Sequence, residues 1–321
     1  MKIVVLHGVD ALEPPADPVM DQVATALRHA GHDAVTMSVS GRIEPLVRDL
    51  ALAEPDLVFN LTESFRDVSS MDSNLAALLN LLGLRYTGSS PSGLFLAGDK
   101  SLTKKVLSFH KIPTPLFASL YRGALDHAGD LTFPVIVKPP QEDASIGINE
   151  SSVVEDLPSL LHKIDELHNA YRAPILVEEF IPGREFYVGV LGNAHPQALP
   201  IIELSFDDNP ANPHRIASFD VKWDESRDQE TRSIFPEDLS EELIQKMQKI
   251  AVDAFNALRL RDYARIDLRL NEQGEAFVIE VNPNCYLEKS GEFARASEKA
   301  GIRYQTMIER IAELASARYA R

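Results

Sequence analysis

Short apolar runs and helix-spaced apolar positions alternate through the first third of the chain. We expect strands at Ile3–Leu6, Ala34–Ser38 and Asp56–Leu61, where apolar residues are consecutive. We expect helices at Val19–Ala30 and Leu75–Leu82, where apolar residues recur every three or four positions and a glycine follows. This alternation predicts a parallel sheet with helices outside. Ligands of such sheets bind at the carboxyl ends of the strands, so the loops after the first and third strands are candidate substrate walls; plain connecting loops are the alternative.

The pattern changes near residue 95 and again near residue 183. The domains predicted from these changes are 1–94, 95–182 and 183–321. The elements expected in the middle domain are helices at Asp99–His110 and Leu157–Ala170, a strand that ends at Lys138, and a strand at Ile175–Phe180. In the last domain we expect a hairpin and two terminal helices. Its polar segment Asp207–Glu237 is long for a loop in a compact domain, and such loops are usually functional or disordered.

Two amphipathic strands joined by a turn form the expected hairpin. The strands are Ala264–Leu270 and Ala276–Asn282, because polar and apolar residues alternate along both. The sequence NEQG at 271–274 supplies the turn residues. With these four residues as the loop, the register predicts two opposing pairs, Leu270 with Glu275 and Arg265 with Glu280.

Side chains alternate between the two faces of a strand, so this hairpin has a polar face and an apolar face. The polar face carries Arg265, Asp267, Glu280 and Asn282 together with Val278, and the apolar face of the second strand carries Phe277, Ile279 and Val281. Three oxygen-bearing side chains beside an arginine suit Mg²⁺ and a bound phosphate, because magnesium prefers oxygen ligands. The alternative is an ordinary amphipathic hairpin with solvated charges.

Composition narrows the class of protein. The 321 residues are 45% hydrophobic and 25% charged, as in globular proteins, and the net charge of −16 argues against nonspecific binding to nucleic acid or anionic membranes. The lone cysteine, Cys285, excludes a disulfide framework and a cysteine-rich zinc site, and we expect a small buried thiol. With no apolar stretch long enough to span a membrane and no targeting signal, a cytoplasmic location is expected. A homodimer is compatible with the chain, and the oligomeric state stays open.

Several motifs in a fixed order resemble one superfamily. FPVIVKPPQEDASIG, VEEFIPGREF, RIDLRL and IEVNPN occur in sequence, and EFARASEKAGIRYQTMIERI follows them. The chain resembles the ATP-grasp superfamily and, within it, the D-alanine–D-alanine ligases. The resemblance implies an α/β protein of the ATP-grasp fold, with an N-terminal parallel-sheet (Rossmann-like) domain and two α+β domains that clamp ATP. It also implies an ATP-dependent carboxylate–amine ligase that forms a peptide or amide bond through an acyl phosphate, acting on amino-acid or peptide-like substrates.

The resemblance assigns nucleotide-binding roles residue by residue. The implied ATP-binding residues are Lys100 and Lys138 at the α- and β-phosphates, Ser145 and Gly147 in the loop over the phosphates, Glu178 and Ile181 at adenine, Glu185 at the ribose, and Lys222 at the γ-phosphate. Without the resemblance, each lysine would be read as a surface residue. Neither the P-loop pattern GxxxxGK[ST] nor the dinucleotide pattern GxGxxG is present.

The same resemblance assigns metal and catalytic roles. The implied ligands of Mg²⁺ or Mn²⁺ are Asp267, Glu280 and Asn282. Arg265 matches the group that stabilises the tetrahedral intermediate, and Lys222 acts with it on the reacting phosphate. The backbone N–H of Tyr286 would serve the oxyanion in place of the family's glycine.

The substrate segments depart from the family pattern while the nucleotide and metal motifs keep it. The departures are Asp143 and Ala144 in the phosphate loop, Trp223 after Lys222, Tyr286 and Gly291 after the hairpin, and Thr62-Glu63-Ser64 in place of a histidine-glycine loop. We therefore expect D-alanine to be a poor substrate, or not the only one. The alternatives are a ligase or cyclase of specialised metabolism with other substrates, and a nucleotide-binding relative that has lost ligation.

Overall fold

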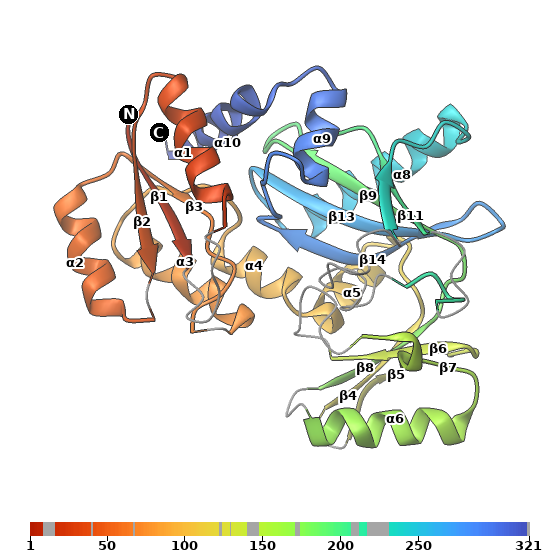
Figure 1. The fold of residues 1–321 in the computed structure, drawn as a ribbon. Coiled ribbons are helices and arrows are strands. Elements are labelled where there is room, and N and C mark those ends of the chain that lie inside the picture. Colours follow the sequence, from red (N-terminus) through yellow and green to blue (C-terminus); the bar gives the residue numbers. More distant parts are fainter. Residues whose placement is uncertain are drawn as a thin grey trace.

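Three β-sheets and the helices around them make up the molecule (Figure 1). The computed structural model describes residues 1–8, 17–39, 41–66, 68–121, 124–128, 130–139, 148–170, 174–206, 212–216 and 231–319. No helix in this described part of the chain is both long enough and apolar enough to cross a membrane.

The N-terminal sheet has the strand order β2-β1-β3, and both pairs are parallel, which confirms the predicted parallel sheet. The elements are β1 (Lys2–Gly8), α1 (Val19–His29), β2 (Asp33–Val39), α2 (Ile43–Ala53), β3 (Leu57–Asn60), the 3-10 helix η1 (Ser69–Met71) and α3 (Asp72–Leu81). The carboxyl ends of β1 and β3 lie side by side, since the N–H of Leu61 donates to the carbonyl of Leu6 at 2.8 Å. The sequence pattern misses α2, where Pro45 interrupts the run, although proline is tolerated in the first turn of a helix.

The strand β1 is buried on both faces. Ile3 and Val5 pack in a cluster that includes α1 and the C-terminal helix, whereas Val4 and Leu6 pack against α2 and α3. All four side chains are fully buried. This two-sided burial explains why the strand reads as an uninterrupted apolar run.

The middle sheet has the order β5-β4-β8-β6-β7, and all its pairs are antiparallel. Its elements are β4 (Phe117–Tyr121), β5 (Ala124–Ala128), β6 (Val135–Lys138), the 3-10 helix η2 (Glu150–Ser152), β7 (Val153–Val154), α6 (Leu157–Ala170) and β8 (Ile175–Glu179). Helix α6 covers one face (Figure 1). The predicted strands at Lys138 and at Ile175–Phe180 and the predicted helix Leu157–Ala170 are confirmed.

Two helices connect the N-terminal and middle sheets. They are α4 (Pro91–Ala97) and α5 (Lys100–Phe109). Asp99 caps the N-terminus of α5, because its side chain accepts a hydrogen bond from the N–H of Leu102 at 3.0 Å. Leu107 of α5 packs in the core of the C-terminal sheet rather than under the middle sheet. The prediction places α5 in the middle domain, yet it packs with the C-terminal sheet, so the domain boundaries at 94 and 182 stay a proposal.

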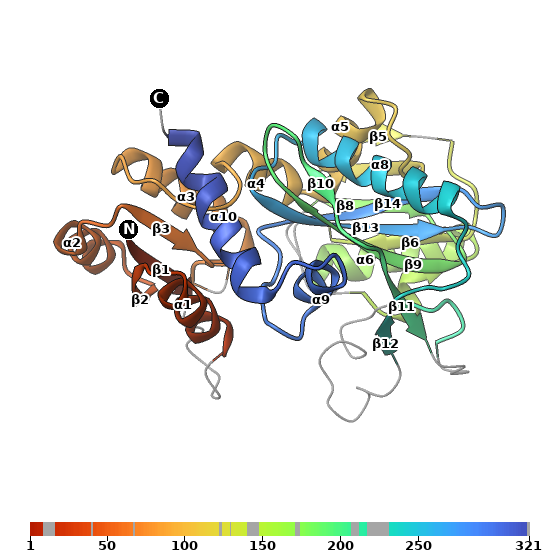
Figure 2. The same cartoon turned by 90° about the horizontal axis from the view of Figure 1, so that it is seen from above.

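The C-terminal sheet has the order β12-β11-β9-β13-β14, with β10 paired to β9. Its elements are β9 (Arg184–Leu191), β10 (Gln197–Ala198), β11 (Ile202–Phe206), β12 (Thr231–Ile234), α8 (Glu241–Ala257), β13 (Tyr263–Leu270), β14 (Ala276–Pro283), α9 (Glu292–Lys299) and α10 (Tyr304–Tyr319). Helix α8 covers one face and α10 lies between this sheet and the N-terminal sheet (Figure 2). The two terminal helices are confirmed. Helix α8 is missing from the predicted elements although its buried residues Met247, Ala251 and Ala254 have helical spacing.

The predicted register of the hairpin is wrong. The observed partners are Leu270 with Ala276, Asp267 with Glu280, and Arg265 with Asn282. The turn holds five residues, 271–275, because Leu270 pairs with Ala276. Within it, the N–H of Asn271 donates to the Glu275 carbonyl at 3.0 Å. A β-bulge then shifts the register between Asp267 and Leu268.

Relative to the predicted register, the extra turn residue and the bulge each shift β14 by one position. Because the total shift beyond the bulge is two positions, each side chain there lies on the face that was predicted for it. Arg265, Asp267, Glu280 and Asn282 therefore share one face, as predicted. Between the turn and the bulge, the two faces of β14 are the reverse of the prediction. Val278 is 1% exposed and packs in the core, whereas Ile279 lines a pocket. The bulge thus turns Glu280 toward that pocket.

A buried carboxylate joins the N-terminal sheet to the C-terminal sheet. Asp262 is fully buried and accepts hydrogen bonds from the N–H of Gly88 at 2.7 Å and from Asn193 Nδ2 at 2.8 Å. Arg318 of α10 donates to it twice, from Nη2 at 2.7 Å and from Nε at 3.0 Å. Arg318 also donates to the carbonyl of Tyr86 at 2.9 Å. These bonds fasten the segment after α3 to the C-terminal sheet and its last helix.

Candidate active site

A pocket lies between the middle sheet and the C-terminal sheet. It encloses about 610 Å³ of empty space, a figure that includes space open to solvent. Six residues expected to bind nucleotide or metal line it: Lys100, Lys138, Glu178, Ile181, Glu185 and Glu280. They come from α5, β6, β8 and the loop that follows it, β9 and β14, and the fold brings them to one cavity.

The two lysines implied at the phosphates line this pocket, and each lies in an ion pair. Lys138, at the end of β6, places Nζ 2.9 Å from Glu178 Oε1. Lys100, the first residue of α5, places Nζ 2.9 Å from Glu280 Oε1. Both lysines are less than a tenth exposed. Buried ammonium groups of this kind are suited to bind anions, because low exposure strengthens their interaction with a charged ligand.

A third lysine, Lys104, was missed by the sequence analysis. It is 1% exposed, and its Nζ lies 3.1 Å from Glu178 Oε2 and donates to Thr114 Oγ1 at 3.1 Å. Burial lowers the pKa of Lys104 from 10.5 to about 8, against the opposing effect of Glu178. The signal that could have found it is its spacing of four residues from Lys100, which places both on one face of α5.

Replacement of Lys104 by methionine tests this burial. Native Lys104 releases its proton near pH 8, whereas the unfolded chain keeps it until about pH 10.5. The depressed pKa therefore makes the wild type gain stability relative to Lys104→Met as the pH rises from 7.5 to 9.5, by at most about 1.4 kcal/mol per pH unit. Urea unfolding at both pH values measures the change. Equal differences at the two pH values would contradict it, and Lys246→Met, an exposed lysine on α8, is the control.

The end of the pocket next to the loop that follows β8 is lined by apolar side chains. Phe180 and Ile216 pack with Val153 in one cluster, and Ile136 and Ile148 lie against it. Ile216 is 5% exposed and belongs to the described part of the polar segment 207–237. An apolar slot edged by the carboxylate of Glu178 fits a flat base with an exocyclic amine.

Glu185 occupies the neighbouring wall. Its Oε1 accepts a hydrogen bond from the hydroxyl of Tyr187 at 3.2 Å, and its Oε2 lies 3.6 Å from Arg269 Nη1. Glu185 is 6% exposed, so these partners hold the carboxylate in place. A fixed carboxylate beside an apolar slot suits the hydroxyl groups of a ribose.

The polar face of the hairpin forms a compact network. Arg265 donates to both oxygens of Asp267, from Nε at 2.8 Å and from Nη2 at 2.9 Å, and Asn282 Nδ2 donates to Asp267 Oδ2 at 3.0 Å. Arg265 also lies 3.7 Å from Glu292 and over the ring of Tyr187 at 4.4 Å. Burial opposes the charge of Arg265, but Asp267 more than offsets it and holds the pKa of Arg265 well above its usual value. The guanidinium therefore stays charged at any working pH.

The donors of this face fit Mg²⁺ bound together with phosphate. Within the described ranges, no group of three or more His, Cys, Asp and Glu side chains is arranged to hold a metal ion by itself. Asp267 and Glu280 are directly opposed, and Asn282 adds an amide oxygen. Two carboxylates and one amide match the preference of Mg²⁺ for few protein ligands plus phosphate oxygens and water.

Three of the expected site residues, Ser145, Gly147 and Lys222, lie outside the described residues, as do Asp143, Ala144 and Trp223.

Comparison with known proteins gives the family. The chain matches the family model described as D-ala D-ala ligase C-terminus over residues 118–313. It is 33% identical over 300 residues to a D-alanine–D-alanine ligase from Marinomonas sp., a match that covers 91% of this chain and 88% of that protein. The chain belongs to the D-alanine–D-alanine ligase family.

Two further matches extend over almost the whole chain. An uncharacterized protein, y4sG, from Sinorhizobium fredii is 32% identical over 310 residues, covering 95% of this chain and 89% of that protein. The crystal structure of D-alanine–D-alanine ligase from Bacillus anthracis complexed with ATP superposes with a TM-score of 0.75 at 21% identity, covering 98% and 97% of the two chains. The predicted ATP-grasp fold and the predicted enzyme class, a ligase that forms carbon–nitrogen bonds, are thereby confirmed.

The loop that departs from the D-alanine–D-alanine ligase pattern is bonded to the N-terminal domain. The hydroxyl of Tyr286 donates to Asp17 Oδ1 at 2.7 Å, and His7 Nε2 lies 3.5 Å from Asp17 Oδ2. Glu288 accepts from Gln22 Nε2 at 2.8 Å. Burial and the bond to Asp17 raise the pKa of Tyr286, so its hydroxyl remains a donor. The departing loop and the carboxyl end of β1 therefore meet.

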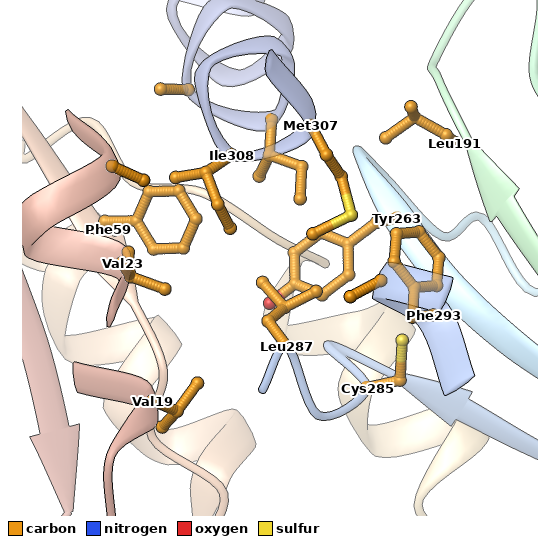
Figure 3. Packing of buried hydrophobic residues seen from close by; sticks show 14 of the residues in the cluster. Val19, Val23, Phe59, Leu191, Tyr263, Cys285, Leu287, Phe293, Met307 and Ile308 are labelled. Carbon is orange, nitrogen blue, oxygen red and sulfur yellow. The ribbon is translucent and has the colours of Figure 1, made fainter. Parts of the chain in front are cut away.

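The thiol of Cys285 is buried, as predicted. It is 6% exposed among the side chains of the largest apolar cluster, beside Phe293 and Tyr263 (Figure 3). Burial raises the pKa of the Cys285 thiol, so the reactive thiolate is scarce at neutral pH.

We expect Cys285 to react with a thiol-specific chromogenic disulfide at least about a hundredfold more slowly in the folded protein than in urea, because attack needs both exposure and thiolate. Absorbance of the released thiol measures the rate. Rapid labelling of the folded protein would show that Cys285 is accessible.

Proposed function

We propose that this protein is an ATP-dependent carboxylate–amine ligase that joins amino-acid or peptide-like substrates through an acyl phosphate. The observation that carries the proposal is the single pocket in which two buried lysines, the Glu178 carboxylate and Glu280 converge. In the reaction, a substrate carboxylate attacks the γ-phosphate, ADP leaves, and an amine then displaces phosphate from the acyl phosphate.

The residues have the following proposed roles. Lys100 and Lys138 hold the α- and β-phosphates, Glu178 and Ile181 hold adenine, Glu185 holds the ribose, Ser145 and Gly147 close over the phosphates, and Lys222 contacts the γ-phosphate. Arg265 stabilises the oxyanion of the tetrahedral intermediate, and the backbone N–H of Tyr286 donates to the same oxygen. Asp267, Glu280 and Asn282 would hold Mg²⁺ or Mn²⁺, which supplies positive charge to the phosphates when bound.

We propose further that D-alanine is not the sole substrate. The loop that carries Tyr286 is tied to Asp17 and Gln22 by side chains that this sequence places there. Gly291, which stands where the family has a serine, directly precedes α9 and has no side chain to offer a substrate carboxylate. Sites that lose such hydrogen-bonding partners change their choice of substrate strongly.

Phosphate release with Mg-ATP across a panel of D- and L-amino acids and dipeptides tests the proposal, with products identified by mass spectrometry. We expect equal amounts of phosphate and of a peptide product for at least one pair other than two D-alanines. Nucleotide binding without turnover on any pair would instead identify a nucleotide-binding relative that has lost ligation. Efficient formation of D-alanyl-D-alanine with no competing pair would support ligation and refute the altered specificity.

A further inference from the structure

One buried charge in the pocket wall has no part in the roles proposed above. Arg269 lies on β13 directly opposite Glu185 of β9, and it lines the pocket with only 5% of its surface exposed. It shares a strand face with Arg265 and Asp267. Burial lowers the pKa of Arg269 from 12.5, and a charge in such a place is costly unless several partners compensate it.

The partners of Arg269 are backbone carbonyls from two separate segments. Nη2 donates to the carbonyls of Gly183 at 3.1 Å and of His214 at 3.2 Å, and Nη1 donates to the carbonyl of Arg215 at 3.2 Å. The guanidinium also lies over the ring of Phe180, at 5.0 Å from its centroid. A planar fork can make these contacts together, whereas a lysine ammonium cannot.

The contacts to residues 214 and 215 have a consequence for the apolar slot. Ile216 follows directly and forms part of the slot wall. Asn212 closes this short segment on itself, since its Oδ1 accepts from the N–H of Ile216 at 2.8 Å. Holding the two carbonyls therefore fixes where Ile216 lies beside a bound base.

The contact to Glu185 has a consequence for the ribose side. Tyr187 and Arg269 each approach a different oxygen of this carboxylate, at 3.2 and 3.6 Å. Of these two neighbours only Tyr187 is within hydrogen-bond distance, and a carboxylate has about four lone-pair sites, so free sites remain on both oxygens for ligand hydroxyls. With both neighbours in place, the direction of those free sites is set before a ligand arrives.

We propose that Arg269 is a positioning residue that sets ribose recognition by orienting Glu185 and by fixing Ile216 against the base. The inference rests on the proposed function, because it takes Glu185 as the acceptor for the ribose hydroxyls. Arg269 acts through these two residues and touches no reacting atom.

Calorimetric binding of ADP, 2′-deoxy-ADP and 3′-deoxy-ADP with Mg²⁺ tests the proposal on wild type, Arg269→Met and Arg269→Lys. The control is Arg184→Met, the neighbouring arginine on β9, which forks to Glu203 and Asp238 and lies over Phe186 outside the pocket. We expect wild type and Arg184→Met to bind ADP about tenfold or more tightly than at least one deoxy analogue. In Arg269→Met that ratio falls toward one and ADP binds about tenfold more weakly.

Four other outcomes of the binding experiment would each contradict a specific part of the proposal. An unchanged ratio in Arg269→Met shows that the arginine only stabilises the fold, and the inference fails while the proposed function stands. Full recovery of the ratio in Arg269→Lys shows that a positive charge suffices and refutes positioning by the planar guanidinium. If Arg269→Met does not fold, the ratio in Arg269→Lys alone tests the proposal. If the wild type binds ADP and both deoxy analogues equally tightly, the proposed roles of Glu185 and Arg269 in ribose recognition are both wrong. A wild type that binds no nucleotide refutes the proposed function itself.

Discussion

Replacement of Glu280 by glutamine is expected to lower kcat roughly a hundredfold or more, equivalent to about 2.7 kcal/mol, without unfolding the protein. Glu280 lies opposite Asp267 on the pocket face of the hairpin, 2.9 Å from Lys100. Glutamine keeps the size of the side chain and removes the charge that both Lys100 and a metal ion would use. The fold should survive because this face lies away from the apolar core under α8.

Steady-state kinetics and thermal unfolding of the same preparations check this prediction. Glu272→Gln makes the same chemical change at an exposed position in the turn of the same hairpin, so it should leave kcat unaltered. If folded Glu280→Gln turned over like Glu272→Gln, the hairpin would have no part in the chemistry.

A change of Asp262 to asparagine is expected to lower the free energy of unfolding by about 3 kcal/mol. Both carboxylate oxygens accept from Arg318, and they also accept from Gly88 and Asn193. An asparagine NH₂ would face donors at either oxygen position, and the charge of Arg318 would lose its partner. Asparagine tolerates the backbone φ of +65° found here, so the change tests the bonds rather than the backbone.

Chemical denaturation of Asp262→Asn measures the loss. Asp253→Asn is the matched control, because Asp253 pairs with exposed Lys249 on the surface of α8, where ion pairs contribute little. A loss no larger than that of the control would mean that the junction between the N-terminal and C-terminal sheets does not depend on this carboxylate.

Local patterns predicted the elements that carry strong periodicity, and long-range geometry set the rest. The parallel sheet, α6 and the shared face of Arg265, Asp267, Glu280 and Asn282 follow from periodicity alone. The register did not, because a five-residue turn and a bulge each add one residue, and nothing in NEQG distinguishes a four-residue loop from a longer one.

The residues of the site fall into the same two groups, those that the sequence predicts and those that only the structure reveals. Residues within a recognisable motif, such as Lys138 and Glu178, could be named from the sequence, although their roles remain proposals. Arg269 could not, because it acquires its partners only when β13 meets the segments that hold Gly183 and His214. For Lys104 the only signal is its spacing from Lys100, since its partner Glu178 comes from β8. Ile216 lies in a polar stretch, so no apolar pattern points to its place in the pocket wall.

The two-sided burial of β1 has a consequence for how the chain is made in the cell. Val23 and Phe59 of the N-terminal unit share one apolar cluster with Met307 and Ile308 of α10, and Ile308 faces Phe59 (Figure 3). During translation the first strand and its helices emerge early, when this side of the sheet is covered by α1 and still lacks α10. The packing on that side is completed only when α10 has been synthesised, so this unit is finished after later parts of the chain although it is made first.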